Sequence, residues 1–191
     1  MSYPVVIYFD PATAAKFSAL RATLPPPASD EAREALQARP HVTLAGWEEL
    51  DVAPFTAALQ AFAVRTAPLD VYLGAVGIFP GDQGVVYIAP RVTTDLLGLH
   101  ARFHARLGAF GSGLNPFCTL DTWIPHATVA LYLAEQEIPA VVQACRGSDL
   151  FGPATLVEIA LLEYPPLREL CAFPLGTARD SAASGRGFDG A

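Results

Sequence analysis

The chain has 191 residues, of which 52% are hydrophobic and 16% are charged, and its formal net charge is −7. This length and apolar content fit a globular protein with a sizeable core, and the sequence holds no run of about 18 apolar residues that would predict a transmembrane helix. The 12 basic residues form no cluster, which argues against a protein that grips a long nucleic-acid duplex through its phosphates.

The N-terminal residues and the cysteines indicate the compartment. Met1-Ser2-Tyr3-Pro4 shows no basic leader and no cleavage-site pattern, which argues against export by a standard signal peptide. The 3 cysteines (Cys118, Cys145 and Cys171) are odd in number and none lies in a Cys-x-x-Cys arrangement, which favours reduced thiols over a disulfide framework and gives a zinc site of that kind no support. We expect a cytoplasmic monomer with no membrane attachment, no metal and no cofactor.

The first part of the chain predicts strands and helices in alternation. Asp10-Pro11 follows a run of β-forming residues and has the pattern of a helix N-cap and first helical position. Pro25-Pro26-Pro27 ends that helix. In chain order we predict a strand over residues 5–9, a helix over 11–21 and a short helix or surface loop over 28–38. A short strand over 41–44 and a second helix over 52–64 follow.

The second part of the chain repeats this alternation. Two strands over 69–78 and 85–89 flank the turn at 80–84 and predict a hairpin. A helix over 93–109 and a Gly/Ser/Asn/Pro-rich loop over 110–117 follow. The strand of the second motif then runs to about residue 133, and a helix follows over 135–145. Two strands over 154–163 and 169–175 precede a disordered tail over 177–191.

The element order is strand–helix–strand–helix–strand, given twice and followed by one closing strand. An internal duplication is the simplest account of this order. It predicts a mixed α/β (α+β) fold in which two βαβ-type lobes with antiparallel-rich sheets flank a central cleft about a pseudo-twofold axis. Residues 1–176 would form this single bilobal domain.

Two short segments at matching places in the two halves have nearly the same sequence. Pro40-His41-Val42-Thr43-Leu44 and Pro125-His126-Ala127-Thr128-Val129 contain 2 of the 4 histidines of the chain. Because residues i and i+2 of a strand point to one face, each segment presents a His beside a Thr and turns its apolar residues the other way.

Two imidazoles and two hydroxyls that face one cleft form a set suited to phosphate esters. Free histidine has a pKa near ~6.5, so one neutral ring can take a proton from water while a protonated ring donates one to the leaving alkoxide. Threonine hydroxyls can hold the phosphoryl oxygens. The scheme requires no metal.

The two His-x-Thr-x motifs, His41-Val42-Thr43-Leu44 and His126-Ala127-Thr128-Val129, resemble those of the 2H phosphoesterase superfamily. The likeness extends over residues 3–176, and the branch most similar is the bacterial 2′-5′ RNA ligase-like group of RNA 2′,3′-cyclic phosphodiesterases. It implies an active site in the central cleft, with His41 as the acid at the 3′ oxygen, His126 as the base for water, and Thr43 and Thr128 as phosphate ligands. The product would be a 2′-phosphate, and the reverse reaction would be 2′-5′ RNA ligation; an exchange of the acid and base roles stays open.

Members of this branch often carry an arginine just after a motif, whereas Ala45-Gly46 and Ala130-Leu131 stand there in this chain. We name three arginines as possible substitutes and four aromatic side chains that could stack on a nucleobase, with core packing as the default for each aromatic: Arg39, Arg91 and Arg168, and Tyr8, Phe79, Trp123 and Tyr132. His100 and His104 share a helix face, but no third metal ligand is evident, so we expect them to be structural.

The expected substrate is a small cyclic phosphate or an RNA end carrying one. Three alternatives stay open. The substrate could be another small cyclic phosphodiester, such as an ADP-ribose cyclic phosphate; the cleft could bind nucleotides or RNA ends without turnover; or the two histidines could be structural, in which case they would lie far apart or be buried.

Overall fold

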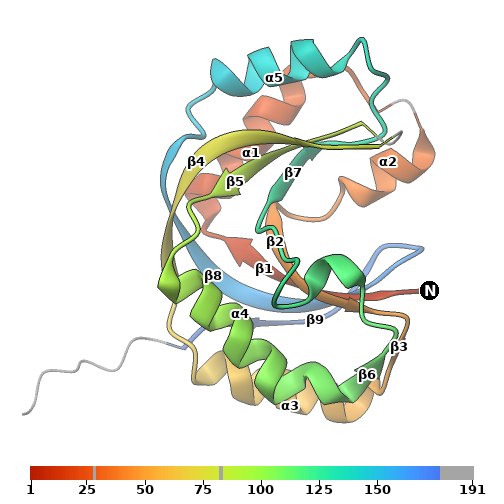
Figure 1. Cartoon of the computed structure of the whole chain (residues 1–191), viewed down its shortest axis with the longest axis vertical. Helices are drawn as coiled ribbons and strands as arrows, with labels where there is room; N and C mark the ends of the chain where they lie inside the picture. The colour runs from red at the N-terminus through yellow and green to blue at the C-terminus, as the bar shows by residue number, and fades with distance from the viewer. Residues whose placement is uncertain (28, 82–83, 177–191) are drawn as a thin grey trace, which may run out of the picture.

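A single antiparallel sheet organises the computed structural model, which describes residues 1–27, 29–81 and 84–176 (Figure 1). Six strands follow the order β2-β1-β8-β4-β5-β7, and β9 pairs with β8 as a seventh. In chain order the strands of this sheet are β1 (Tyr3–Phe9), β2 (His41–Trp47), β4 (Leu69–Phe79), β5 (Val85–Pro90), β7 (Ala127–Ala130), β8 (Gly152–Glu163) and β9 (Arg168–Pro174). The predicted tail, 177–191, lies outside the described residues.

Five α-helices surround the sheet, in the places that the sequence predicts: α1 (Pro11–Thr23), α2 (Asp30–Ala35), α3 (Val52–Val64), α4 (Thr94–Leu107) and α5 (Ile138–Arg146). Side-chain caps fix three of their starts. The Asp10 carboxylate accepts the Thr13 amide at 2.9 Å, the Ser29 hydroxyl accepts that of Ala32 at 3.0 Å and Thr93 caps α4 in the same way. The segment 28–38, for which the sequence predicts a short helix or a surface loop, thus contains the short helix α2.

Two boundaries differ from the sequence prediction. The strand of the second motif ends at Ala130 rather than near residue 133, because Tyr132 has a φ of 56°, which an extended strand does not allow. A small two-stranded sheet, β3 (Glu49–Leu50) with β6 (Gly111–Ser112), was not predicted. It joins the end of β2 to the loop that follows the short 3₁₀ turn η1 (Gly108–Phe110).

The strand order is symmetric about the β8–β4 pair. If β1, β2 and β4 of the first half correspond to β5, β7 and β8 of the second, the order reads the same from both ends. This agrees with the predicted pseudo-twofold arrangement and confirms the fold class. The lobes, however, are not the two halves of the sequence: β8 pairs with β4 through residues 152–156 and with β1 through residues 156–161, so each half contributes its third strand to the other lobe.

The helices are exchanged in the same way. α1 packs against α5 and β7, and α3 packs against α4, β8 and β9, so that α1, α2 and α5 lie at the top of the view and α3 and α4 at the bottom (Figure 1). Most buried apolar side chains of both lobes form one continuous cluster, and Val6, Tyr8, Ala160 and Leu162 form a second, smaller one. In the described part of the chain, no helix has the length and apolar character needed to cross a membrane.

Candidate functional site

The two His-Thr motifs lie at the two edges of the main sheet. β2 and β7 stand at opposite ends of the strand order, yet they contact each other in space. The long strands β4 and β8 curve strongly, and the two edge strands approach each other near the centre of the molecule (Figure 1). Motifs from distant parts of the chain therefore meet in one region.

Burial alternates along both motifs as the strand pattern predicts. The side chains of His41 and Thr43 are partly exposed, and so are those of His126 and Thr128. The apolar residues that follow each of these four are fully buried or nearly so. The polar members of each motif thus share one face, while the apolar members anchor the strand in the core.

The two imidazoles are held by the same kind of contact. Nδ1 of His41 lies 2.6 Å from the carbonyl oxygen of Arg39, and Nδ1 of His126 lies 2.7 Å from that of Ile124. Because a carbonyl oxygen can only accept, Nδ1 carries the hydrogen in both rings. Nε2 is then the acceptor of each neutral imidazole, and it could act as a base, or as an acid once protonated.

Aromatic rings support both imidazoles from the neighbouring strands. Tyr8 of β1 packs edge-on against His41 with ring centroids 6.1 Å apart. Tyr87 of β5 and Phe79 of β4 pack against His126 at 5.3 and 4.7 Å. These contacts limit rotation of both rings about the Cβ–Cγ bond.

A cavity of about 530 Å³ opens beside the motifs. Thr43 of the first motif and His126 of the second both line it, together with a set of apolar, aromatic and small polar residues: Phe79, Pro80, Gly81, Gly84, Val85, Asn115, Phe117, Cys118, Thr122, Trp123 and Ile124. His41 and Thr128 are not among the lining residues; Thr128 is partly exposed on β7, and His126 directly precedes that strand. The volume falls within the range of small-molecule sites.

Burial is the main cause that keeps both imidazoles neutral in the ligand-free protein. Desolvation lowers the pKa of His41 to about 4, and the positive charges of Arg21 and His126 act in the same direction. Desolvation also lowers the pKa of His126, while its bond to the Ile124 carbonyl opposes that shift. A bound anion would raise the pKa of both rings.

Comparison with known proteins decides the family. A family model described as the 2′-5′ RNA ligase superfamily matches residues 5–166. The chain belongs to this superfamily, the 2H phosphoesterases. Membership supports an enzyme that acts on phosphodiester bonds. A search among curated proteins found no match.

Solved structures of similar fold agree with this membership. Escherichia coli LigT in apo form is 19% identical, with a TM-score of 0.57 over 92% of this chain and 98% of LigT. LigT complexed with 3′-AMP is 18% identical, with a TM-score of 0.59 over 91% and 96% of the two chains. TT0787 of Thermus thermophilus is 18% identical, with a TM-score of 0.58 over 94% of this chain and 100% of that one. At these identities the likeness establishes the fold.

Side chains from outside the sheet bond to the open edge of β2, the first motif strand of this 2H protein. The indole Nε1 of Trp123 donates to the Thr43 carbonyl at 2.8 Å. His100 is 1% exposed, stacks on Trp123 at 3.9 Å between ring centroids, and places Nε2 3.0 Å from the Leu44 carbonyl. His104 lies 3.0 Å from His100, so the predicted structural histidines support the first motif from behind.

The three arginines named from the sequence have partners elsewhere. The Arg39 guanidinium lies over the Tyr8 ring at 3.7 Å and pairs with Glu158 and Glu169. The Arg91 guanidinium lies over the Tyr72 ring at 3.9 Å. Arg168 pairs with Glu163 at 3.8 Å. Sequence reasoning missed the arginine whose charge reaches the site, Arg21 of α1. No spacing points to it, because α1 meets β7 only through the tertiary exchange of helices.

The aromatic candidates divide in a similar way. Phe79 and Trp123 line the cavity, whereas the Tyr8 hydroxyl donates to Glu169 at 2.9 Å and the Tyr132 hydroxyl donates to Glu31 at 2.8 Å. Phe117, which the sequence analysis did not name, lines the cavity and is 77% exposed. An aromatic residue within a Gly/Ser/Asn/Pro-rich loop was the sequence signal that could have identified it.

Proposed function

We propose that this protein is a metal-independent phosphodiesterase that opens 2′,3′-cyclic phosphates of RNA ends or nucleotides to 2′-phosphates. The observation that carries the proposal is the pair of imidazoles on β2 and directly before β7, two edge strands in contact, each ring with Nδ1 bonded to a carbonyl so that Nε2 can act on a ligand. A threonine stands two residues after each histidine, on the same face of its strand.

The reaction divides between the two rings. Nε2 of one neutral imidazole takes a proton from a water molecule, whose oxygen attacks phosphorus in line with the 3′ oxygen. The bond from phosphorus to the 3′ oxygen breaks, and Nε2–H of the other, protonated ring supplies the proton to the leaving oxygen. Thr43 and Thr128 donate hydroxyl hydrogens to the non-bridging oxygens. The product is a 2′-phosphate, and the exact reverse would expel water and close the 2′,3′-cyclic phosphate again; a 5′-hydroxyl in place of the water would give a 2′-5′ linkage.

The pKa values of the free protein suit this scheme once the substrate is bound. Both imidazoles are neutral near pH 7, because burial lowers their pKa. The charge of a phosphodiester would raise the pKa of each ring, and one proton shared across the site then gives the acid and the base. Binding of the substrate thus favours the protonated imidazole that acts as the acid.

The size and lining of the cavity support a nucleotide-sized substrate. Structures of E. coli LigT exist as complexes with 3′-AMP, phosphate and ATP. In this chain the cavity of about 530 Å³ offers Phe79, Phe117 and Trp123 as aromatic walls beside Thr43 and His126. Stacking on such walls accepts any base, so the proposal includes nucleotides as well as RNA ends.

The test is hydrolysis of a 2′,3′-cyclic nucleotide in excess chelator, with the product identified by phosphorus NMR. We expect a 2′-phosphate from the wild type and a loss of at least about 10²-fold in rate from either His41→Ala or His126→Ala. Full activity in both variants would refute the proposal. Tight nucleotide binding without turnover over days would favour a binding protein, and turnover of ADP-ribose cyclic phosphate alone would move the proposal to that substrate.

A further inference from the structure

The carbonyl oxygens of the two motif threonines are bonded by side chains of different charge. Thr43 O accepts from the neutral indole of Trp123 at 2.8 Å. Thr128 O accepts from Nη2 of Arg21 at 2.7 Å. β2 and β7 are both edge strands, so these carbonyls take their partners from outside the sheet. One motif is therefore backed by a neutral donor and the other by a cation.

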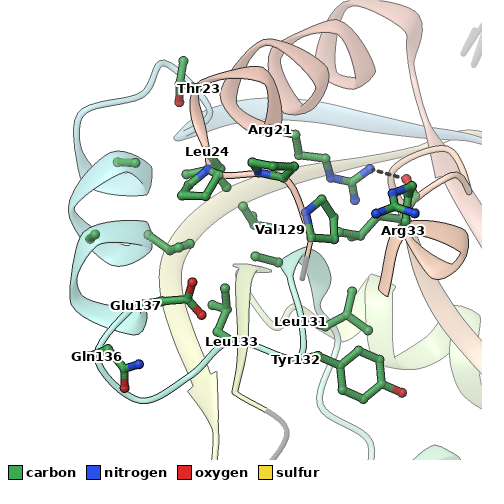
Figure 2. Close-up of a pocket in the computed structure, with 18 of the residues that line it drawn as sticks. Arg21, Thr23, Leu24, Arg33, Val129, Leu131, Tyr132, Leu133, Gln136 and Glu137 are labelled. Atoms are coloured by element: carbon green, nitrogen blue, oxygen red, sulfur yellow. Dashed lines mark hydrogen bonds between the residues drawn. The ribbon is translucent and has the colours of Figure 1, made fainter. Parts of the chain in front are cut away.

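Arg21 occupies a costly position for a charged group. Its Nη1 donates to the Leu36 carbonyl at 3.3 Å, and Figure 2 shows the side chain reaching from α1 toward the region of Arg33 to make this bond. Its Nε is buried without a hydrogen-bond partner among the described residues. Within that part of the chain no carboxylate forms an ion pair with it, although Arg33 and Arg39 are both paired with acids. A partly buried guanidinium that bonds only to carbonyl oxygens has no acid to compensate its charge.

The cavity in Figure 2, of about 560 Å³, does not supply the missing anion. Its walls are mainly apolar, with Leu24, Val129 and Leu133 among them, although Arg21 and Arg33 also line it. The unpartnered Nε of Arg21 is buried, so a ligand in this cavity could not bond to that atom. The charge instead acts toward the motifs, where it is one of the causes that lower the pKa of His41.

We propose that Arg21 is the cationic positioning residue of the cleft: it fixes the Thr128 carbonyl from behind β7 and supplies the positive potential that holds the substrate phosphate. This inference rests on the proposed function for the identity of the substrate, but the binding of a phosphate anion can be tested without turnover. The residues that follow the second motif, Ala130 and Leu131, carry no charge, so Arg21 provides from another element the cation that this side of the site lacks.

The expected size of the effect follows from Coulomb's law. Two unit charges about 10 Å apart at an effective dielectric constant of about 20 change a binding constant by roughly tenfold. Because Arg21 is partly buried, salt would screen this interaction less than it screens an exposed pair.

The experiment compares three variants by NMR titration with inorganic phosphate and by the pKa of His41. Arg21→Met removes the charge and keeps the length of the side chain. Arg21→Lys keeps the charge and loses the fork that bonds two carbonyls. Arg168→Met is the matched control, because it removes one positive charge from a side chain that is 66% exposed and pairs with Glu163.

We expect Arg21→Met to weaken phosphate binding roughly tenfold and to raise the pKa of His41. Arg21→Lys should leave that pKa near its wild-type value and lower kcat more than it raises KM, because the charge stays while Thr128 loses its fixed carbonyl. Arg168→Met should change neither quantity. A folded Arg21→Met protein with wild-type phosphate affinity and an unshifted His41 would overturn the inference.

Two further outcomes separate this inference from the proposed function. If Arg21→Met does not fold, Arg21→Lys decides: wild-type kcat in that variant refutes the positioning role. If the wild type does not hydrolyse cyclic phosphates but loses phosphate affinity on Arg21→Met, the proposed function fails and the role of Arg21 stands.

Discussion

Replacement of Trp123 by phenylalanine tests whether the support behind β2 positions the first motif. Trp123→Phe removes the indole N–H that donates to the Thr43 carbonyl at 2.8 Å. The aromatic ring that stacks on His100, now at 3.9 Å, would remain. The cavity wall also stays aromatic, so the change is mainly the loss of one hydrogen bond.

The structure sets the expected size of this loss. A partly buried carbonyl left without its donor costs about 1–3 kcal/mol, and the smaller ring loses some packing, so we expect about 2–3 kcal/mol. In a chain of this length that corresponds to a fall in Tm of about 5–10 °C. Because the Thr43 peptide is no longer fixed, we expect kcat to fall between about tenfold and 10²-fold.

The control is a buried hydrogen bond of the same kind far from the motifs. Thr66 is 8% exposed, and its hydroxyl donates to the Phe62 carbonyl at 2.8 Å. Thr66→Val should lower the Tm by a few degrees and leave kcat unchanged. Thermal unfolding and turnover of a 2′,3′-cyclic nucleotide are measured for both variants. The reasoning is refuted if Trp123→Phe and Thr66→Val lose stability alike and neither loses kcat.

Three further predictions follow from the site. Burial lowers the pKa of His41 and of His100 to about 4, so below about pH 6.5 the unfolded chain binds more protons than the native protein. The free energy of unfolding should therefore fall as the pH is lowered from about 6.5 to 4, by up to about 3 kcal/mol for each histidine. Denaturant unfolding at several pH values measures this, and a flat profile would mean that the rings are not buried. Gly77→Ala would drive its Cβ into the Tyr87 ring, which packs on His126, so kcat should fall roughly tenfold in a folded protein, and an unchanged kcat would mean that this packing does not orient the ring. If His41 is the acid, His41→Ala should lose much less activity on a nitrophenyl phosphodiester, whose leaving group needs no proton, than on a cyclic nucleotide, and the same pattern in His126→Ala would exchange the two roles.

The sequence predicted the strands and helices because the signals for them are local. Asp10-Pro11 caps α1, and the alternation in the first motif gives the buried and exposed faces of β2. The exchange of strands and helices between the halves could not be read in this way. β8 pairs with β4 and β1 through contacts between residues far apart in the chain, and the same apolar pattern would also suit two separate lobes.

The candidate site shows the same division. The repeated motif pointed to His41 and His126, which the structure brings into one region, whereas Arg21 carries no motif and reaches Thr128 only because α1 lies behind β7. Arg39 looked as promising in the sequence, directly before a motif, yet its guanidinium turns to Glu158 and Glu169. Sequence position placed the backbone of these arginines, and tertiary contacts determined where their charges act.

The curvature of the sheet explains why side chains outside the motifs can tune this site. Edge strands carry backbone groups with no strand partner, and a protein has to cover them. Here the two edges approach each other inside the molecule, so the covering groups lie directly behind the motifs. The contacts of the two imidazoles are of one kind, His41 to Arg39 and His126 to Ile124, so the difference in charge between the two sides arises from the covering groups. The loss of kcat in Trp123→Phe should therefore be the same at all salt concentrations. The loss of phosphate affinity on removal of the Arg21 charge should instead become smaller as the salt concentration rises.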